Sequence, residues 1–277
     1  MLRGGAAAAR RGLLRGGALA GLAGAAGLAG AGGRGAGPAR AAGGAKKKGL
    51  EGTLDGITWP AEIPFRAESF TRYDESPDSL FYQDPRFVTH IDDKAIAALS
   101  GYYKEVFPSG SNEDVAVLDL CSSWISHFPK GFQCGRVAGL GMNAEELRRN
   151  EALTEYEVQD LNQQPRLPYG DNAFDFVVNA VSVDYLTKPY EVFAEIQRVL
   201  KPGGLAVMSF SNRCFPTKAI SIWTQTGDLD HIMIVGSYFH YTPGFAAPQV
   251  RDLTPPPNPI FGGSDPMYAV VGRKLEA

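Results

Sequence analysis

The sequence Val115-Ala116-Val117-Leu118-Asp119-Leu120, followed by the polar loop Cys121-Ser122-Ser123-Trp124, decides the fold. The run is short and almost wholly apolar, with little polar alternation, which is typical of a strand covered on both faces of a parallel sheet. Further runs of this kind stand at 136–141, 156–160, 174–179 and 200–208. Strands that alternate with helices predict a doubly wound α/β domain.

Helix signals lie before and between these strands. Apolar residues share one helical face over 90–107, and Asn143 is a fair N-cap for a helix that runs to about residue 149. The clearest helix begins at 187–189 and ends at Pro202-Gly203-Gly204, which turns into the fifth strand. Weaker helices are predicted at 124–128 and 219–224.

The flanking segments give other signals. Residues 49–87 mix prolines with aromatic residues and predict an irregular arm that packs over the domain and can also cover a substrate site. The Ile, Val, Tyr and Phe content of 231–241 favours a strand or a cap element. The proline-rich stretch 254–259 predicts an extended connection, and 268–272 predicts a closing edge strand.

The composition of the first 48 residues predicts a targeting signal rather than a folded domain. They are almost entirely Ala, Gly, Leu and Arg, with nine basic residues and no acid. A basic, acid-free, low-complexity N-terminus is typical of an organelle-targeting peptide, which we predict to direct the protein to a chloroplast, with the mitochondrion as an alternative.

Two other interpretations of this segment stay open. The run Arg10-Arg11-Gly12-Leu13-Leu14, with a cleavage site at Ala39-Arg40-Ala41, resembles a twin-arginine signal for export into a thylakoid lumen. An unstructured tail without an address is the third interpretation. The uncharged stretch 16–33 is too weakly apolar for a convincing membrane span.

Charge and cysteine usage restrict the partners. The remaining 229 residues carry 18 basic residues against all 30 acids, a net charge of −12. Nucleic acids and anionic membranes are bound largely by Lys and Arg, so we predict a small or neutral partner rather than either of these. Cys121, Cys134 and Cys214 form neither a CxxC pair nor an even set, which predicts free thiols in a reducing compartment.

Four motifs follow one another along the α/β segment: Val117-Leu118-Asp119-Leu120, Gln159-Asp160-Leu161, residues 167–177 (LPYGDNAFDFV) and residues 195–204 (EIQRVLKPGG). Together they resemble the class I S-adenosylmethionine-dependent methyltransferase family, in particular its type 11 branch, over roughly residues 90–212. The resemblance implies a Rossmann-like, mostly parallel seven-stranded sheet with an antiparallel last strand. It also implies S-adenosylmethionine as the cofactor, and a domain over 88–277.

The same resemblance assigns roles to residues at the strand ends. It implies that Asp119 lies beneath the methionine part of the cofactor, and that the loop 121–124 wraps its amino and carboxylate groups through backbone N–H. Asp160 and Leu161 would flank the adenine, and Asn179 with Ala180 would lie near the sulfonium and the acceptor. The predicted cofactor-binding residues are Asp119, Cys121, Ser122, Ser123, Gly141, Met142, Asp160, Leu161 and Asn179. From the residues alone, Asp160 is equally well explained as a turn residue and Asp119 as a brace for its loop.

Two positions depart from the family pattern. The family's first loop is glycine-rich because the backbone approaches the ligand and takes positive φ. Here Cys121, Ser123 and Ile125 replace the glycines, and Ile125 is the hardest to fit at positive φ. Gly141 stands where the family has an acid for the ribose, and Asn143 or Glu145 are substitutes within reach. The loss of such a bond costs about 1.5–3 kcal/mol, so weakened cofactor binding is expected.

No catalytic base is evident, and methyl transfer from a sulfonium needs mainly an aligned nucleophile. Asp184 and Tyr185 follow the fourth strand. His231 and His240, near Tyr238 and Tyr241, are candidate bases, although histidines among aromatic residues are more often packed or surface residues. No metal-ligand spacing, nucleophile elbow or Walker loop is present, and no His is placed by sequence to activate Cys121.

Two hypotheses remain. The first is an enzyme that transfers a methyl group from S-adenosylmethionine to a small-molecule acceptor, favoured by the retained Asp119 and Asp160. The second is a catalytically inactive methyltransferase-fold protein with a binding or regulatory role, favoured by the altered loop and the missing ribose acid. A nicotinamide-dependent activity is weaker, because no GxGxxG follows the first strand. The oligomeric state is not indicated by the sequence.

Overall fold

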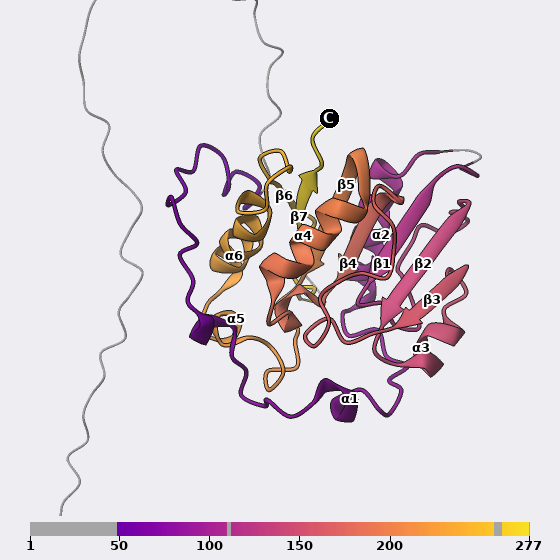
Figure 1. Ribbon diagram of the computed structural model, residues 1–277, viewed down its shortest axis with the longest axis horizontal. Helices are drawn as coiled ribbons and strands as arrows, with labels where there is room; N and C mark the ends of the chain where they lie inside the picture. The colour runs from indigo at the N-terminus through magenta and orange to yellow at the C-terminus, as the bar shows by residue number, and fades with distance from the viewer. Residues whose placement is uncertain (1–48, 110–111, 258–261, 277) are drawn as a thin grey trace, which may run out of the picture. The chain divides into compact units, whose positions relative to one another are not determined.

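The computed structural model describes residues 49–109, 112–257 and 262–276, so the predicted targeting peptide over 1–48 lies outside the described residues. At the centre is a seven-stranded sheet with the order β3-β2-β1-β4-β5-β7-β6 (Figure 1). Its strands are β1 (Ala116–Leu120), β2 (Arg136–Gly141), β3 (Glu155–Val158), β4 (Phe174–Ala180), β5 (Leu200–Phe210), β6 (Gln249–Asp252) and β7 (Tyr268–Arg273).

Strand pairing confirms the predicted fold class. The pairs β1·β2, β1·β4, β2·β3 and β4·β5 are all parallel, whereas β7 is antiparallel to both β5 and β6. The strand order reverses between β1 and β4, and in an open α/β sheet ligands bind beyond the carboxyl ends of the strands at such a point.

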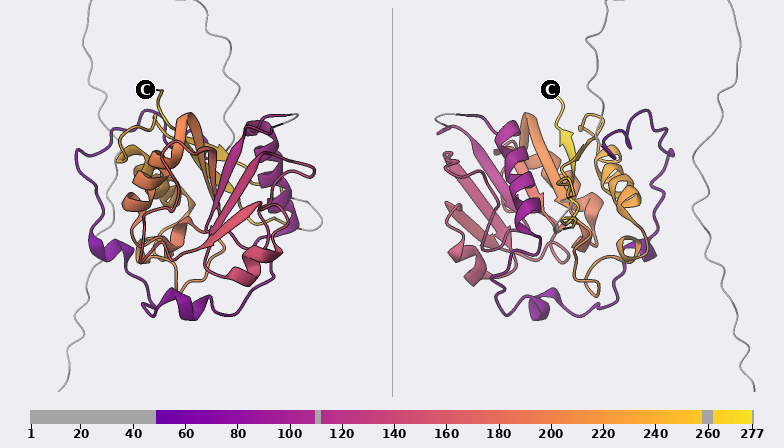
Figure 2. Two further views of the ribbon diagram at one scale, coloured as in Figure 1. Left: turned by 45° about the vertical axis from the view of Figure 1, so that its right-hand side comes forward. Right: turned by 180° about the vertical axis from the view of Figure 1, so that it is seen from behind.

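Helices cover both faces of the sheet. They are η1 (Ala67–Phe70), α1 (Asp78–Phe81), α2 (Asp93–Val106), α3 (Ala144–Arg149), η2 (Val183–Tyr185), α4 (Pro189–Val199), α5 (Ser221–Thr224) and α6 (Asp228–His240), where η marks a 3-10 helix. α4 and α6 lie on one face and α2 lies on the other (Figures 1 and 2). None of the helices within the described residues is long and apolar enough to cross a membrane.

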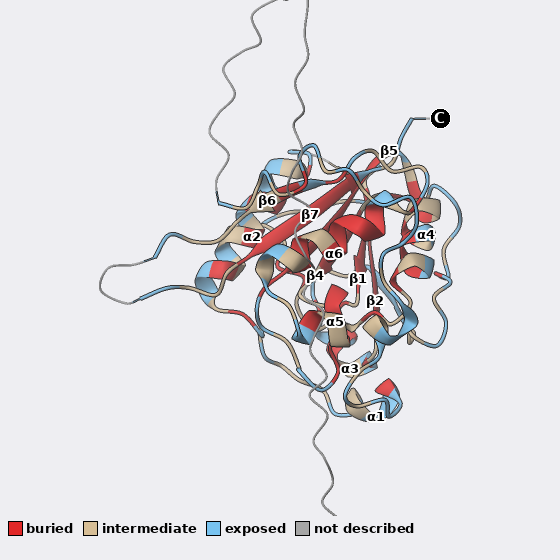
Figure 3. Ribbon diagram, turned by 90° about the vertical axis from the view of Figure 1, so that its left-hand side faces the viewer, coloured by how far each residue is buried: buried red, intermediate tan, exposed pale blue. Residues whose placement is uncertain are grey.

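The hydrophobic cores on the two faces of the sheet explain why the strands lack polar alternation. All five residues of β1 are buried. Leu118 and Leu120 belong to the core that includes α4 and α6, whereas Val117 packs with the apolar face of α2. The central strands are accordingly buried along most of their length (Figure 3).

Local signals position the helices as expected. Asn143 caps α3, because its side-chain oxygen accepts from the N–H groups of Glu145 and Glu146 at 2.9 and 3.1 Å. Asp92 caps α2 in the same way, so that helix begins later than the predicted residue 90. Pro189 stands in the first turn of α4.

Four predicted elements differ from the structure. Residues 124–128 form no helix, and β3 ends at Val158, two residues before the predicted end. The segment predicted as a strand or a cap element over 231–241 is most of helix α6. β7 is not an edge strand, because β6 pairs with it on the outer side.

The arm over 49–87 packs on the α4/α6 side of the sheet and then passes the carboxyl ends of the parallel strands (Figure 1). The Phe70 ring contacts those of Tyr190 and Tyr238 edge-on or tilted, and the Trp59 ring stacks on His240 with centroids 5.0 Å apart. These aromatic contacts anchor its first part. Its second part, from α1 onward, reaches the candidate site.

Candidate functional site

A cavity of about 310 Å³ lies at the carboxyl ends of β1, β2 and β4. It is lined by eight of the nine residues predicted to bind a cofactor: Asp119, Cys121, Ser122, Ser123, Gly141, Met142, Asp160 and Leu161. The structure thus brings together, at the reversal of strand order, residues that lie up to 42 positions apart in the sequence.

Asn179 is the exception. Its side chain is fully buried beneath the cavity, where its Nδ2 donates to the carbonyl of Leu120 at 3.0 Å. Its Oδ1 has no hydrogen-bond partner among the described residues. Asn179 therefore ties β4 to the end of β1, while its neighbour Ala180 lines the cavity.

Asp119 is a buried acid at the base of the cavity. Its Oδ2 accepts hydrogen bonds from the hydroxyls of Ser122 and Ser126 at 2.7 and 2.6 Å. Burial raises the pKa of this carboxyl to about 6, and the two serine hydroxyls lower it only in part. Asp119 braces its loop, as one interpretation predicted, and its charge still changes close to neutral pH.

The loop after β1 takes a conformation that the glycine pattern did not locate. Cys121, at the first of the three glycine positions, has φ +58°, whereas Ile125 is not among the residues with positive φ. The expectation that Ile125 is the poorest fit is therefore wrong. The Ser122 N–H donates to the Leu140 carbonyl at 2.8 Å, so it serves the strand end rather than a ligand. Trp124 lies outside the cavity, with its Nε1 donating to the Val88 carbonyl.

Gly141 has a steric reason to be glycine. A Cβ built at this position would overlap the backbone carbonyl of Ser122, so the family's acid does not fit here. The proposed substitutes are also engaged elsewhere. The side-chain oxygen of Asn143 accepts the hydrogen bonds of the α3 cap, and its Nδ2 donates to the carbonyls of Tyr82 and Gln83. Glu145 does not line the cavity.

The next acid along the sequence that does line the cavity is Glu146, which is buried in the first turn of α3. Its Oε2 accepts from the hydroxyl of Ser123, and its Oε1 accepts from the N–H of Arg86, both at 2.6 Å. The sequence showed Glu146 only as a first-turn acid. The arm supplies its second partner, the N–H of Arg86.

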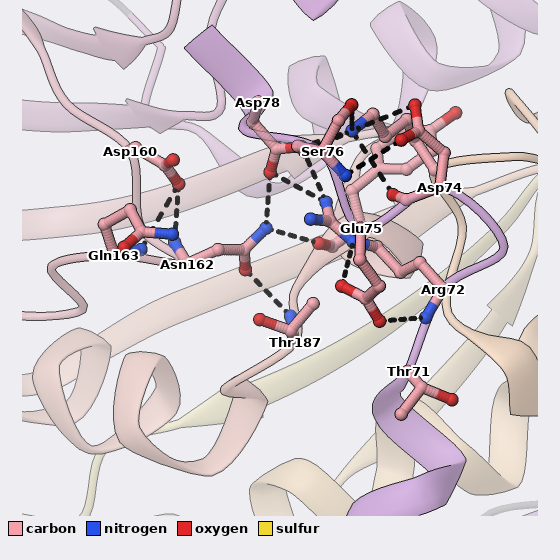
Figure 4. Close-up of polar contacts among 12 residues, drawn as sticks. Thr71, Arg72, Asp74, Glu75, Ser76, Asp78, Asp160, Asn162, Gln163 and Thr187 are labelled. Carbon is pink, nitrogen blue, oxygen red and sulfur yellow. Dashed lines mark hydrogen bonds and ion pairs between the residues drawn. The ribbon is translucent and has the colours of Figure 1, made fainter.

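Asp160 combines the turn role with a free oxygen. Its Oδ1 accepts from the N–H groups of Asn162 and Gln163 at 2.8 and 3.4 Å (Figure 4). Its Oδ2 accepts no hydrogen bond from the described residues. The adjacent Leu161 is buried and contributes an apolar wall.

Backbone strain gathers around this cavity. Among the described residues, five that are not glycine have φ between +45° and +64°. Four of the five line the cavity: His90, Cys121, His127 and Val181. Val181 is β-branched, for which this region is a true outlier. Such conformations cost about 1–3 kcal/mol each and cluster at functional sites.

The arm is fastened beside the cavity by a buried polar network (Figure 4). At its centre, both oxygens of Asp78 accept from Arg72 Nη1 at 2.7 Å, and Oδ2 also accepts from Asn162 Nδ2 at 2.9 Å. Asn162 follows the Asp160 turn, and its Nδ2 also donates to the Tyr185 carbonyl after β4. The network therefore joins the arm to two loops of the cavity.

Lys218 completes this network from the segment after β5. Its side chain is fully buried, and its Nζ lies 3.2 Å from a carboxylate oxygen of Asp74 and of Asp78. The same Nζ donates to the carbonyl of Ser76 at 2.7 Å. The arm segment 72–78 is thereby held by a buried ammonium.

The candidate bases lie elsewhere. His231 is buried, stacks on Trp223 and bonds its carbonyl through Nε2, and His240 stacks on Trp59. Neither lines the cavity, nor do Tyr238 and Tyr241. Asp184 is also buried outside the lining, and burial raises its pKa to about 8.

Two further reactive side chains, a hydroxyl and a thiol, line the cavity. Tyr185 lines it, and its hydroxyl accepts from the N–H of Phe215 at 2.8 Å. Burial raises the pKa of the Cys121 thiol to about 12, so this thiol is protonated at neutral pH and is a poor nucleophile.

Sequence reasoning missed the cavity wall opposite the strand ends. The arm contributes Tyr82 and Arg86, His90 follows it, and the segment after β5 contributes Cys214 and Phe215. The arm was predicted to cover a site in general terms, but no local pattern indicated which of its side chains reach the cavity.

Comparison with known proteins fits this geometry. Residues 121–208 match the family model of the methyltransferase domain (Methyltransf_11). The match and the strand order confirm the resemblance to class I S-adenosylmethionine-dependent methyltransferases, whose cofactor was predicted from the sequence.

Similar whole proteins are more distant. The malonyl-[acyl-carrier protein] O-methyltransferase of Hahella chejuensis is 28% identical over 124 residues, which cover 40% of this chain and 43% of that protein. The enzyme of the same name from Marinomonas sp. is 28% identical over 67 residues, or 24% and 25% of the two chains. The chain thus spans less than half the length of these relatives. A crystal structure of an S-adenosylmethionine-dependent methyltransferase from Mesorhizobium loti has 17% identity and a TM-score of 0.45, covering 64% of this chain and 98% of that one.

The methyltransferase domain offers groups that fit S-adenosylmethionine. The free Oδ2 of Asp160 can accept from an exocyclic amine beside the apolar Leu161, and Asp119 supplies a negative charge at the base of the cavity. The ribose position is the weak point, because Gly141 carries no acceptor. The residues present therefore fit the cofactor, with one fewer anchor than the family pattern provides.

Proposed function

We propose that the protein binds S-adenosylmethionine in this cavity and transfers its methyl group to a small-molecule acceptor. The observation that carries the proposal is the cavity, which assembles Asp119, the loop 121–123 and the pair Asp160–Leu161 at the strand-order reversal. When bound, the cofactor supplies a methyl group on a positively charged sulfur, so its transfer requires alignment of the acceptor more than activation by a base.

The chain's own residues have separable roles in this proposal. Asp160 accepts from the adenine amine, Leu161 covers the base, and Asp119 stabilises the ammonium of the methionine end. The arm residues opposite them exclude water and orient the acceptor. A cavity of about 310 Å³ is at the small end of ligand pockets.

Calorimetric titration of the full chain with S-adenosylmethionine and its demethylated product tests the proposal. We expect micromolar binding that Asp160→Asn weakens at least tenfold, because the amide keeps the turn acceptor but presents N–H to the adenine amine. The matched control is Asp171→Asn, an exposed acid outside the cavity, which should leave binding unchanged. Absence of binding at millimolar ligand would refute the proposal.

The inactive alternative is favoured by one observation, the exclusion of the ribose acid at Gly141. It is separated from the first hypothesis by turnover. The acceptor screen is run with protein and cofactor at equal concentrations, so that a single turnover is detected. Cofactor binding without methylated product under these conditions would favour the binding or regulatory role.

The location of this activity is proposed from the sequence alone. We propose that residues 1–48 direct the protein to an organelle, the chloroplast first, because the segment is basic and free of acids. The full chain with a C-terminal fluorescent protein should enter the chloroplast of plant cells, and the same fusion without residues 1–48 should not. Mitochondrial or thylakoid-lumen signal would select one of the alternatives.

A further inference from the structure

One guanidinium in the wall of the cavity forms no ion pair with the described residues. Arg86 lies on the arm, between α1 and α2, and lines the cavity. Its Nη2 donates to the carbonyl of Phe81 at 2.7 Å, while its Nη1 is buried and has no hydrogen-bond partner among the described residues. No carboxylate in the described part of the chain forms an ion pair with it, in contrast to Arg213 in the same wall, which pairs with Asp265.

Aromatic rings surround this charge. The guanidinium carbon lies 4.4 Å from the ring centroid of Phe81, 5.6 Å from that of Phe215 and 5.7 Å from that of Tyr82. Rings on these sides replace water but do not neutralise a cation. A partly buried charge without a counter-ion is costly, and no described carboxylate forms an ion pair with this guanidinium; Glu146 bonds the backbone N–H of Arg86 and the hydroxyl of Ser123 instead.

We propose that Arg86 binds a carboxylate group of the ligand in this cavity. The guanidinium is a planar fork that matches the two oxygens of a carboxylate, and the buried Nη1 supplies an unused donor. This proposal rests on the proposed function in one respect: the ligand is taken to be S-adenosylmethionine or its acceptor.

Each of these two molecules can supply the carboxylate. The N–H of Arg86 bonds Glu146, which bonds the hydroxyl of Ser123, so the arginine adjoins the loop predicted to hold the methionine end of the cofactor. Its guanidinium also lies beside the ring of Phe215, after β5, and Arg86 itself belongs to the arm that we propose to orient the acceptor.

The arm is fixed well enough to hold Arg86 in place. Asp78 begins α1, and its contacts with Arg72, Asn162 and Lys218 anchor the segment eight residues before the arginine (Figure 4). The guanidinium is thus presented from a braced segment, which limits the entropy lost when it binds a ligand.

Two matched ligand pairs test the proposal on the full chain by calorimetry. The first pair is S-adenosylmethionine and decarboxylated S-adenosylmethionine, which differ by the carboxylate alone. The second is benzoate and benzamide, titrated with and without S-adenosylhomocysteine. We expect the carboxylate member of one pair to bind about tenfold or more tightly, and Arg86→Gln to reduce that ratio to about one. Gln keeps a donor for the Phe81 carbonyl but removes the charge.

The controls separate this role from a structural one. Arg149→Gln should keep the ratio, because Arg149 also lies over an aromatic ring, Phe87 at 3.9 Å, but outside the cavity. If Arg86→Gln does not fold, Arg86→Lys takes its place, with an expected fall in the ratio of about fivefold because an ammonium lacks the fork. Ratios near one for both pairs in the wild type, or ratios that depend on Arg213→Gln but not on the Arg86 variants, would overturn the proposal.

The two pairs also identify the source of the carboxylate. If only the first pair shows a higher affinity for its carboxylate member, Arg86 binds the carboxylate of the cofactor. If only the second pair does, Arg86 binds a carboxylate of the acceptor. If neither nucleoside binds at millimolar concentration, the proposed function fails, and the benzoate pair alone still decides whether Arg86 binds a carboxylate.

Discussion

Replacing Lys218 by Met should expose how strongly the arm depends on one buried ammonium. The side chain is 1% exposed, and its Nζ lies within 3.3 Å of oxygens of Asp74, Ser76 and Asp78. Methionine fills much of the same volume, so the lost interactions are polar rather than steric. The carboxylate of Asp78 would remain buried and lose one of its two cationic partners.

The expected destabilisation is about 3 kcal/mol. Breaking a buried ion pair costs about 3–5 kcal/mol when one charge stays behind. The lower end applies here because Arg72 still bonds both oxygens of Asp78 at 2.7 Å. The Ser76 carbonyl also loses its donor, which is part of the same cost. For a domain of this size, 3 kcal/mol corresponds to a fall in Tm of roughly 6–12 °C.

The pH dependence of this difference has a definite sign. Burial opposes ionisation of Asp78, but the hydrogen bonds from Arg72 and Asn162 and the neighbouring charges outweigh it, so its pKa is lowered in the folded state. A lowered pKa contributes stability above the unfolded value of about 3.9 and loses it as the pH falls through the folded value. The gap between wild type and Lys218→Met should therefore narrow below about pH 4.

Urea denaturation at neutral pH, with unchanged slope, measures the difference in the free energy of unfolding. Lys201→Met is the matched control, because Lys201 pairs with Asp175 at 2.7 Å but is 37% exposed, so its loss should cost less than about 1 kcal/mol. If the two substitutions cost the same, the network is not what fastens the arm.

Three further results are expected. Gly141→Asp should destabilise the protein by about 2 kcal/mol or more, because its Cβ overlaps the Ser122 carbonyl, whereas Gly170→Asp, in open space, should stay within about 0.5 kcal/mol in the same urea assay. Cys121→Gly should cost less than about 1 kcal/mol despite the lost thiol, because glycine accepts φ +58°, and Cys121→Val should cost about 2 kcal/mol or more by thermal denaturation; the reverse order would contradict the strain at this residue. The affinity for S-adenosylmethionine should fall as the pH drops below about 6, up to about tenfold per unit, because Asp119 then takes up a proton, and calorimetry should show a flat profile for Asp119→Asn.

The sheet was predictable because the residue pattern of each central strand reflects its burial on both faces. A strand such as β1, buried on both faces, has no polar residues to alternate with, and the helices between the strands carry clear stripes. The sequence did not predict α6 as a helix, because its apolar residues are not confined to one face. It is apolar nearly all round, with buried residues on every side from His231 to Phe239, so it has no stripe to reveal its period.

The cavity was predictable only on the side that the strand ends build. Asp119 and Gly141 lie at the carboxyl ends of β1 and β2, Asp160 follows β3, and parallel strands bring these ends to one edge. Arg86 and Phe215 reach the cavity through tertiary contacts of the arm and of the segment after β5, which no local period encodes. The strain was placed at the wrong residue because the family pattern allows three glycine positions, and only the folded loop shows that Cys121 takes the left-handed one.

The distribution of strain, charge and anchoring around the cavity favours a working site over an inherited shape. Four left-handed residues that are not glycine surround it, each at a cost of about 1 kcal/mol or more, and a fold retained only for its stability would shed such costs. The same wall holds Arg86, which forms no ion pair with the described residues, while the buried network at Asp78 and Lys218 fixes the arm that carries it. If a ligand occupies the cavity, ligand binding explains all three features: the strained loop residues, the guanidinium of Arg86 and the anchored arm. The missing ribose acid then marks a change in how that ligand is anchored rather than the loss of the site.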